Sequence, residues 1–249
     1  MSKKRTLTIV LTLLVAVCLL ATTALAAVVP STPSMPSAPS GATAPSTPDD
    51  PTAPILPSQP SQPSEPELKF IDVNEGDWFY NSVMWAVKNG VTVGTTPTTF
   101  EPYTACTRAQ MIEFLWNAVG KPAATIKSVP FTDVPESGSD DYWYEDSLLW
   151  AYEAGIVAGT NDGSTFSPDQ VCTRAEMISF IARLLSDGAT ADMPFVDVPA
   201  SAWYYNEVQW AWANGLTVGT NDGTTFSPDN ACIRAEAVEF LYNAFAEVE

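Results

Sequence analysis

The chain has 249 residues, with 29 acidic and 11 basic side chains, a formal net charge of −18 and no histidine. These numbers exclude a broad basic surface that neutralises nucleic-acid phosphates. They also exclude Ser-His-Asp catalysis, Cys-His catalysis and every histidine-ligated metal site, and they leave open in principle only catalysis by paired carboxylates.

Residues 1–26 have the pattern of an export signal. Residues 3–5 are basic, residues 7–20 are apolar apart from threonines, and Ala24-Leu25-Ala26 is a small-x-small cleavage site. We expect cleavage after Ala26, which changes the net charge from −18 to −21 because three cations leave. The alternative is an uncleaved anchor, since the apolar stretch is just long enough to cross a bilayer. After cleavage no stable membrane span is expected.

Residues 27–66 are predicted to be an extended linker. Proline stands at every third position from Pro30 to Pro66, with one omission. Polyproline II has three residues per turn, so these prolines line one edge of a rod that reaches roughly 110 Å when fully extended. The serine, threonine, alanine and glutamine between them cannot build a core. The linker is either a spacer through or away from a cell envelope or low-complexity filler.

Residues 67–249 contain three copies of one pattern, which we place at residues 67–122, 128–188 and 193–249. Each copy begins with Phe-x-Asp-Val and continues through Trp-aromatic, Trp-Ala and a glycine. A Gly-Thr turn then leads to Phe-x-Pro and to Arg-Ala followed by Glu or Gln. The first phenylalanines of the copies are Phe70, Phe131 and Phe195. Such an ordered repetition indicates one structural unit used three times.

The first half of each copy is predicted to be a helix, over residues 79–89, 144–154 and 204–214. Apolar residues recur there at helical spacing. Each segment is followed by a glycine, which tolerates the left-handed conformation that ends a helix. These glycines are Gly90, Gly155 and Gly215.

A second helix in each copy begins at the Arg-Ala dipeptide. Thr107 with Gln110, and Thr173 with Glu176, match the capping box, in which each residue satisfies the backbone amide of the other. The third copy keeps Glu236 but has Ile233 in place of the threonine. Loss of such a cap typically costs about 1 kcal/mol, so this helix start is expected to fray more than the others.

Three cysteines occupy one equivalent position, just before the cap of each second helix: Cys106, Cys172 and Cys232. A small hydrophobic residue there packs against the fourth residue of the helix. The alternatives are disulfides or a metal site, but three cysteines cannot all pair within one chain. Copies about 60 residues apart also need not meet in space. We therefore expect buried free thiols, and no metal or cofactor.

Three arginines occupy the first position of the predicted second helices: Arg108, Arg174 and Arg234. A cation is unfavourable there because the helix dipole already places partial positive charge at this end. Free amides at a helix start and a guanidinium fork together suit a carboxylate or a phosphate, so we predict an anion-binding role. The alternative is an interhelical salt bridge to one of the many acidic residues, for example the aspartates of the Phe-x-Asp-Val motifs: Asp72, Asp133 and Asp197.

Two further features are interpreted as structural. The tryptophans of the Trp-Ala dipeptides lie in mid-helix and are expected in the core: Trp85, Trp150 and Trp210. The Asn-Asp-Gly segments at residues 161–163 and 221–223 lack the ligand spacing of a calcium loop and are predicted to be tight turns. The first copy is one residue shorter at this turn, so residues 95–99 should fold differently.

This series of motifs resembles the S-layer homology domain, in three tandem copies over about residues 68–247. The resemblance implies an all-α fold in which three helix-loop-helix repeats form one pseudo-threefold bundle, with three prongs and grooves between them. It also implies a secreted protein held non-covalently at the bacterial cell wall or S-layer. The ligand implied is a secondary cell-wall polysaccharide bearing pyruvyl ketals, bound by Arg108, Arg174 and Arg234. Ile233 and residues 95–99 depart from the pattern, so fewer than three grooves are expected to bind.

Two alternatives stay open for the partner. The strong net negative charge disfavours an anionic polymer, although salt screens the repulsion beyond about 10 Å at 0.1 M. Peptidoglycan that carries amines suits the acidic surface, and an adaptor that binds other envelope proteins uses no glycan at all. We expect neither an enzyme nor a nucleic-acid binder.

Overall fold

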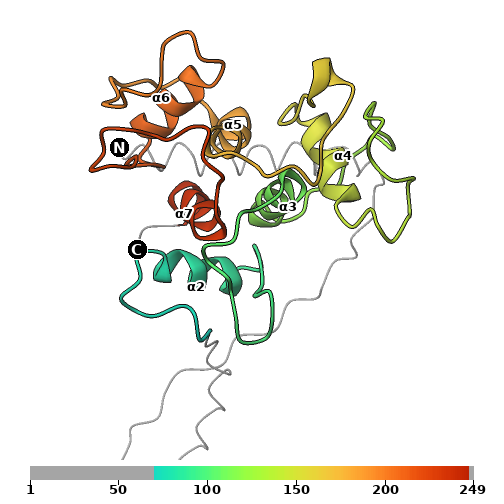
Figure 1. The fold of residues 1–249 in the computed structure, drawn as a ribbon. Helices are drawn as coiled ribbons and strands as arrows, with labels where there is room; N and C mark the ends of the chain where they lie inside the picture. The colour runs from blue at the N-terminus through green and yellow to red at the C-terminus, as the bar shows by residue number, and fades with distance from the viewer. Residues whose placement is uncertain (1–69, 247–249) are drawn as a thin grey trace, which may run out of the picture. The chain divides into compact units, whose positions relative to one another are not determined.

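The computed structural model describes residues 70–246, so the predicted export signal and linker lie outside the described residues. In this part of the chain all the regular elements are helical, which confirms the all-α prediction (Figure 1). The elements in chain order are α2 (Tyr80–Lys88), α3 (Arg108–Ala118), α4 (Glu145–Glu153), the 3₁₀ turn η1 (Asn161–Gly163), α5 (Arg174–Leu185), α6 (Tyr205–Ala213) and α7 (Arg234–Phe245).

Each repeat contributes two helices, and the first of each pair begins and ends within one residue of its predicted bounds. The glycine that follows each first helix has positive φ, which a residue without Cβ adopts at no steric cost. The values are +66° at Gly90, +71° at Gly155 and +73° at Gly215. Local sequence therefore sets where these helices stop.

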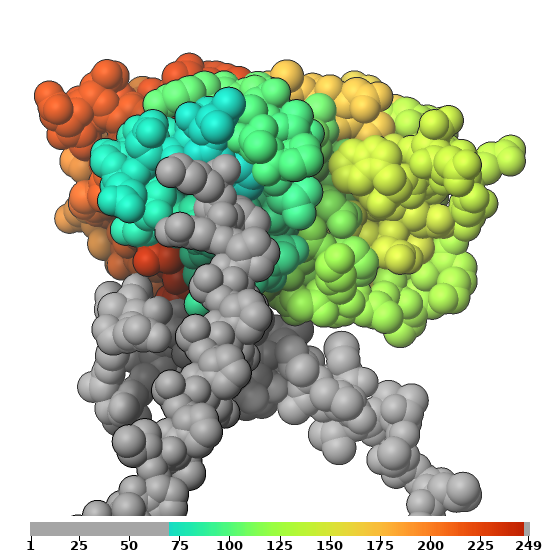
Figure 2. Space-filling model, turned by 90° about the horizontal axis from the view of Figure 1, so that it is seen from below, coloured from blue at the N-terminus to red at the C-terminus, as the bar shows by residue number. Residues whose placement is uncertain are grey.

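The second helices form the centre of the described unit. Helices α3, α5 and α7 contact one another, and the first helices lie around them (Figure 1). Each first helix packs on the second helix of the preceding repeat, α4 on α3 and α6 on α5, while α2 packs on α7. Atoms of the first repeat, in cyan and green, accordingly adjoin red atoms of the third repeat in Figure 2. The packing order is thus cyclic, and the last helix is covered by the first.

The core is built from the apolar stripes of the second helices and from the Phe-x-Pro phenylalanines. Met111, Leu115, Met177 and Ile181 are fully buried, as their spacing predicts. The Phe-x-Pro side chains are also completely buried: Phe100, Phe166 and Phe226. The central helices and the loops that precede them therefore share one core.

The three cysteine segments meet at the middle of the bundle. The Cys106 amide donates to the Cys232 carbonyl (3.0 Å), the Cys172 amide to the Cys106 carbonyl (2.9 Å) and the Cys232 amide to the Cys172 carbonyl (2.9 Å). The thiols are free and fully buried, which confirms that prediction. The copies do meet in space, although their sequence spacing does not require it, because each segment enters a central helix beside the pseudo-threefold axis.

Burial makes these thiols poor nucleophiles. It raises the pKa of Cys106 to about 12 and raises the pKa values of Cys172 and Cys232 well above the usual range. The thiolate is the reactive form. We therefore expect Cys106, Cys172 and Cys232 to stay unmodified when the native chain is exposed to iodoacetamide at pH 8, and to react within minutes in denaturant. Peptide mapping by mass spectrometry gives the outcome for each residue, and rapid labelling of any of the three in the native chain would contradict this account.

The start of α7 is capped on one side only. Glu236 accepts a hydrogen bond from the Ile233 amide (3.2 Å), but the isoleucine side chain has no oxygen to accept the Glu236 amide in return. In α5 the equivalent threonine does accept, at 3.2 Å from Thr173 Oγ1 to the Glu176 amide. The missing half of the capping box is the physical basis for a weaker helix start.

Replacing Ile233 by threonine is expected to raise the free energy of unfolding by about 0.5–1 kcal/mol, because the new hydroxyl satisfies the Glu236 amide. The matched variant Thr173→Ile should lower it by about 1 kcal/mol. Urea denaturation followed by circular dichroism measures both. A threonine at position 233 that leaves stability unchanged or lowers it would contradict the assignment.

Candidate functional site

The start of each second helix packs against the following repeat and is hydrogen-bonded to it. The Arg108 amide donates to the Gln170 carbonyl (2.9 Å) and the Ala109 amide to the Pro168 carbonyl (3.0 Å). The same two bonds recur from α5 to the third repeat and from α7 to the first. The helix-start part of the anion-site hypothesis is therefore wrong, since carbonyls of the next repeat already occupy the first two amides of each helix.

The three arginine side chains lie at the junctions between repeats, and they are only 4–6% exposed. Each Nε donates to a carbonyl of the next repeat: Arg108 to Phe166 (2.9 Å), Arg174 to Phe226 (2.9 Å) and Arg234 to Phe100 (2.8 Å). We call these the first–second, second–third and third–first junctions.

Two phenylalanine rings flank each guanidinium, with Cζ 4.5–5.5 Å from the ring centroids. One ring comes from a Phe-x-Pro motif and the other from a central helix, as with Phe166 and Phe180 around Arg108. A cation between aromatic faces is stabilised by their quadrupoles. The arginines therefore join the repeats by packing as well as by hydrogen bonds.

At two junctions the arginine also forms an ion pair with the capping glutamate of the next repeat. Arg108 Nη1 lies 2.6 Å from Glu176, and Arg174 Nη1 lies 2.5 Å from Glu236. The other carboxylate oxygen of Glu176 accepts the Thr173 amide (2.8 Å), so one side chain caps its helix and neutralises a cation. The predicted capping pairs Thr107–Gln110 and Thr173–Glu176 both form.

The interhelical salt-bridge alternative is therefore confirmed for Arg108 and Arg174, with glutamates as the partners. The aspartates named as possible partners have a different role. Asp72 accepts the amides of Phe100 (2.9 Å) and Glu101 (2.7 Å). Asp133 and Asp197 hold the same two positions in their own repeats at 2.7–2.8 Å. The residue after each Phe-x-Pro phenylalanine has φ between +56° and +58°, a conformation that is strained without glycine. These residues are Glu101, Ser167 and Ser227.

The sequence predicted neither the partners of these aspartates nor their role at the site. By holding the loop at each Phe-x-Pro motif, they set the direction of the phenylalanine carbonyl that the arginine binds. Their recurrence at the start of every repeat was a signal, although their separation from the Phe-x-Pro phenylalanine varies from 28 to 33 residues. The sequence does not identify the partner, because a carboxylate that binds backbone amides requires no particular side chain on the partner residue.

The third–first junction differs from the other two. Gln110 occupies the position of the capping glutamate, and within residues 70–246 the salt bridges are those of Arg108 and Arg174. Arg234 instead donates from Nη2 to the Val93 carbonyl (2.8 Å). Burial lowers the pKa of Arg234 below its usual value, and the nearby Cys106, Glu101 and Asp72 partly offset this effect.

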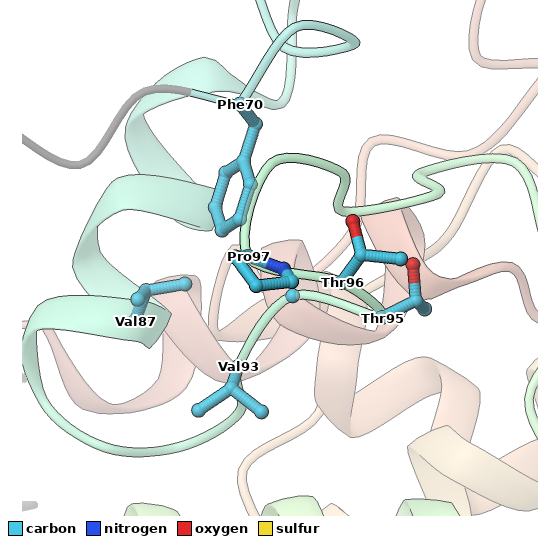
Figure 3. A pocket seen from close by; sticks show the side chains of 7 residues that line it. Phe70, Val87, Val93, Thr95, Thr96 and Pro97 are labelled. Carbon is cyan, nitrogen blue, oxygen red and sulfur yellow. The ribbon is translucent and has the colours of Figure 1, made fainter.

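Val93 also belongs to the wall of a hollow of about 380 Å³ in the first repeat (Figure 3). The lining residues are Phe70, Val87, Val93, Gly94, Thr95, Thr96 and Pro97. The shortened turn contributes to this wall and differs from the other two as predicted. It closes with a Thr96–Thr99 bridge, whereas the longer turns close between Thr160 and Thr165 and between Thr220 and Thr225.

Exposed tryptophans recur at one equivalent position on the surface. Trp78, Trp143 and Trp203 are 56–57% exposed, and each packs edge-on against the aromatic residue that follows it. Of the tryptophans expected in the core, Trp150 and Trp210 are buried, whereas Trp85 is only half-buried. Each repeat thus exposes the flat apolar ring of one tryptophan to solvent.

Two further properties of the described residues concern metal-binding groups and membrane-spanning helices. Among residues 70–246, no three carboxylate or thiol side chains are grouped so as to hold a metal ion. Within the same residues, no helix combines the length and apolar character needed to cross a membrane.

Comparison with known proteins agrees with the repeat pattern. The family model described as "S-layer homology domain" matches residues 69–112, 130–178 and 194–238, together more than half of the chain. A cell surface protein of Thermoanaerobacter kivui is 35% identical over 133 residues, which are 51% of this chain and 16% of that protein.

Two other relatives are a surface-layer protein and an endoglucanase. The surface-layer 125 kDa protein of Lysinibacillus sphaericus is 34% identical over 93 residues (37% of this chain, 8% of that protein). An endoglucanase of Bacillus sp. (strain KSM-635) is 33% identical over 114 residues (46% of this chain, 11% of that protein). The chain thus spans less than a fifth of the length of any of these three relatives.

Truncating a junction arginine is expected to destabilise the fold strongly. Arg108→Ala removes three partners at once and leaves Glu176 without its counter-ion, so the free energy of unfolding should fall by about 3–5 kcal/mol. Guanidinium chloride denaturation measures the change. The control is Lys88→Ala at an exposed position, with an expected change within about 0.5 kcal/mol. A loss below about 1 kcal/mol for Arg108→Ala would contradict a structural role for this side chain.

Proposed function

Because the chain belongs to the S-layer homology domain family, we propose that it attaches non-covalently to the bacterial cell wall at the cell surface. The ligand in this proposal is a secondary wall polysaccharide that carries pyruvyl ketals, and the candidates for recognising its carboxylates are the junction arginines Arg108, Arg174 and Arg234. The role is that of an anchor without catalysis, at the end of an exported and extended linker.

The observation that carries the proposal is the threefold recurrence of a guanidinium at the junction between repeats. A pyruvyl ketal presents one carboxylate on a rigid ring, and a guanidinium recognises a carboxylate through parallel charge-assisted hydrogen bonds. Each of the three arginines uses Nε and one Nη in the described contacts. Each side chain therefore keeps N–H groups that these contacts do not use.

The exposed tryptophans support a saccharide ligand. Trp78, Trp143 and Trp203 offer flat apolar faces at equivalent places in the three repeats, and more than half of each side chain is in contact with solvent. A pyranose ring has an apolar face of similar size. The names of two relatives, a cell surface protein and a surface-layer protein, agree with a location at the cell envelope.

The acidic composition favours a second candidate ligand. With 29 acidic against 11 basic residues, the chain attracts cationic groups at long range, and peptidoglycan that carries free amines has such groups. The three junction arginines have no role in this alternative, because they do not attract cationic groups. Removal of the secondary polysaccharide from the wall separates the two ligands, because it leaves peptidoglycan in place.

Binding to the wall is expected to require the secondary polysaccharide and its carboxylates. The purified chain is mixed with protein-free cell walls from the bacterium that encodes it, before and after hydrofluoric acid has stripped the polymer, and sedimented protein is quantified. We expect binding to intact walls only. A monosaccharide with a 4,6-linked pyruvyl ketal should compete for binding, whereas its methyl ester, which has no charge, should not.

This design uses the unaltered chain, since arginine truncation is expected to disturb folding. If equal amounts of protein sediment with stripped and intact walls, the ligand is peptidoglycan and not the polysaccharide. Absence of binding to both preparations would contradict an anchor altogether and favour the adaptor that binds other envelope proteins.

A further inference from the structure

The three junctions are unequal in charge. Arg108 and Arg174 each face a glutamate at 2.5–2.6 Å, so at these junctions the buried cation is already neutralised. The equivalent position at the third–first junction is Gln110, which caps α3 through its own Oε1 (3.0 Å to the Thr107 amide) but carries no charge. One arginine out of three therefore lies in the fold without a paired carboxylate.

A buried cation without a counter-ion is costly, and a ligand that supplies the missing charge is correspondingly favoured. Arg234 is 6% exposed and is fixed by the Phe100 and Val93 carbonyls, which are neutral acceptors. Its Nη1 has no hydrogen-bond partner within residues 70–246. In the other two junctions Nη1 is the atom that pairs with glutamate.

We propose that the third–first junction is the anion-binding site of this chain, and that Arg234 there takes one carboxylate in the place that glutamate occupies at the other junctions. The proposal rests on the proposed function, of which it names the responsible groove. Gln110 is the specificity-determining residue, because its neutral amide leaves the site open while still capping its helix.

The surroundings of Arg234 fit a small cyclic ligand. The Val93 carbonyl that Arg234 binds belongs to a residue whose side chain is 70% exposed and lines the hollow shown in Figure 3. Phe70 and Pro97 give this hollow an apolar wall, and Thr95 and Thr96 also line it, with their hydroxyls bonded to Thr99 within the turn. An apolar wall suits one face of a sugar ring next to its charged substituent.

Two acidic residues lie near Arg234 without forming an ion pair. Asp72 is held by the Phe100 and Glu101 amides, and the Glu101 side chain lies 3.4 Å from the Thr104 hydroxyl. Both raise the pKa of Arg234, so they compete weakly with an incoming carboxylate. The other repeats have Ser167 and Ser227 where the first has Glu101, so the competition from Glu101 is confined to the third–first junction.

Exchange of glutamine and glutamate between junctions tests the proposal with nearly isosteric changes. Gln110→Glu gives Arg234 the partner that the other arginines have, and Glu236→Gln removes the partner of Arg174. Both residues cap a helix through a side-chain oxygen, which Glu and Gln both supply, so each variant should fold. The probe is the pyruvyl-ketal monosaccharide, titrated calorimetrically into the full chain, with sedimentation on intact cell walls in parallel.

The unaltered chain should bind one equivalent of the monosaccharide. Gln110→Glu should weaken that binding about tenfold or more, as expected when an internal carboxylate competes for one charge-assisted contact. Glu236→Gln should add a second equivalent. Thermal unfolding of the three proteins checks that the folds are equally intact.

The outcomes separate this inference from the proposed function. If the unaltered chain binds walls but Gln110→Glu binds the monosaccharide equally well, the assignment to Arg234 is overturned while the anchor stands. If Glu236→Gln adds no site, the charge-balance argument is also overturned, whatever the other variant does. If the unaltered chain binds neither walls nor monosaccharide, the proposed function itself fails.

Discussion

The backbone hydrogen bonds between repeats are the constraint on which the rest of this structure depends. A ring of three such bonds joins Cys106, Cys172 and Cys232, and each central helix places its first two amides on carbonyls of the following repeat. No repeat can complete its own helix start, because the acceptors belong to its neighbour. The threefold unit therefore folds as one body, and the junctions between repeats are where its polar groups gather.

The arginines follow from that arrangement. A helix start that enters the next repeat carries its first side chain into the junction, where the guanidinium meets a phenylalanine carbonyl and two aromatic rings. Burial of a cation there requires charge compensation, and Glu176 and Glu236 provide it at two junctions. At the third junction Gln110 stands in the position of these glutamates and provides no charge compensation. In our proposal, the structural ion pair at two junctions and the ligand site at the third are two versions of one position.

Features set by neighbouring residues were predictable from the sequence, and features set by the order of packing were not. Helix ends followed from glycine, and helix starts from Thr107 and Thr173 with the residues three positions later. The pairing of Arg108 with Glu176 spans 68 residues and joins two repeats, so the motif Thr-Arg-Ala-Glu conceals that its arginine and its glutamate belong to different junctions. The role of Asp72 was hidden for a related reason, since its partners are backbone amides.

The most direct test of the central claim is to observe the arginine side chains while ligand binds. The chain contains five arginines, and selective ¹⁵N labelling makes their Nε–Hε groups separately visible by NMR. Titration with the pyruvyl-ketal monosaccharide should shift the Arg234 signal and leave those of Arg108 and Arg174 in place, because their carboxylate partners are already present. Equal shifts of all three signals, or a shift confined to Arg108 and Arg174, would contradict the account.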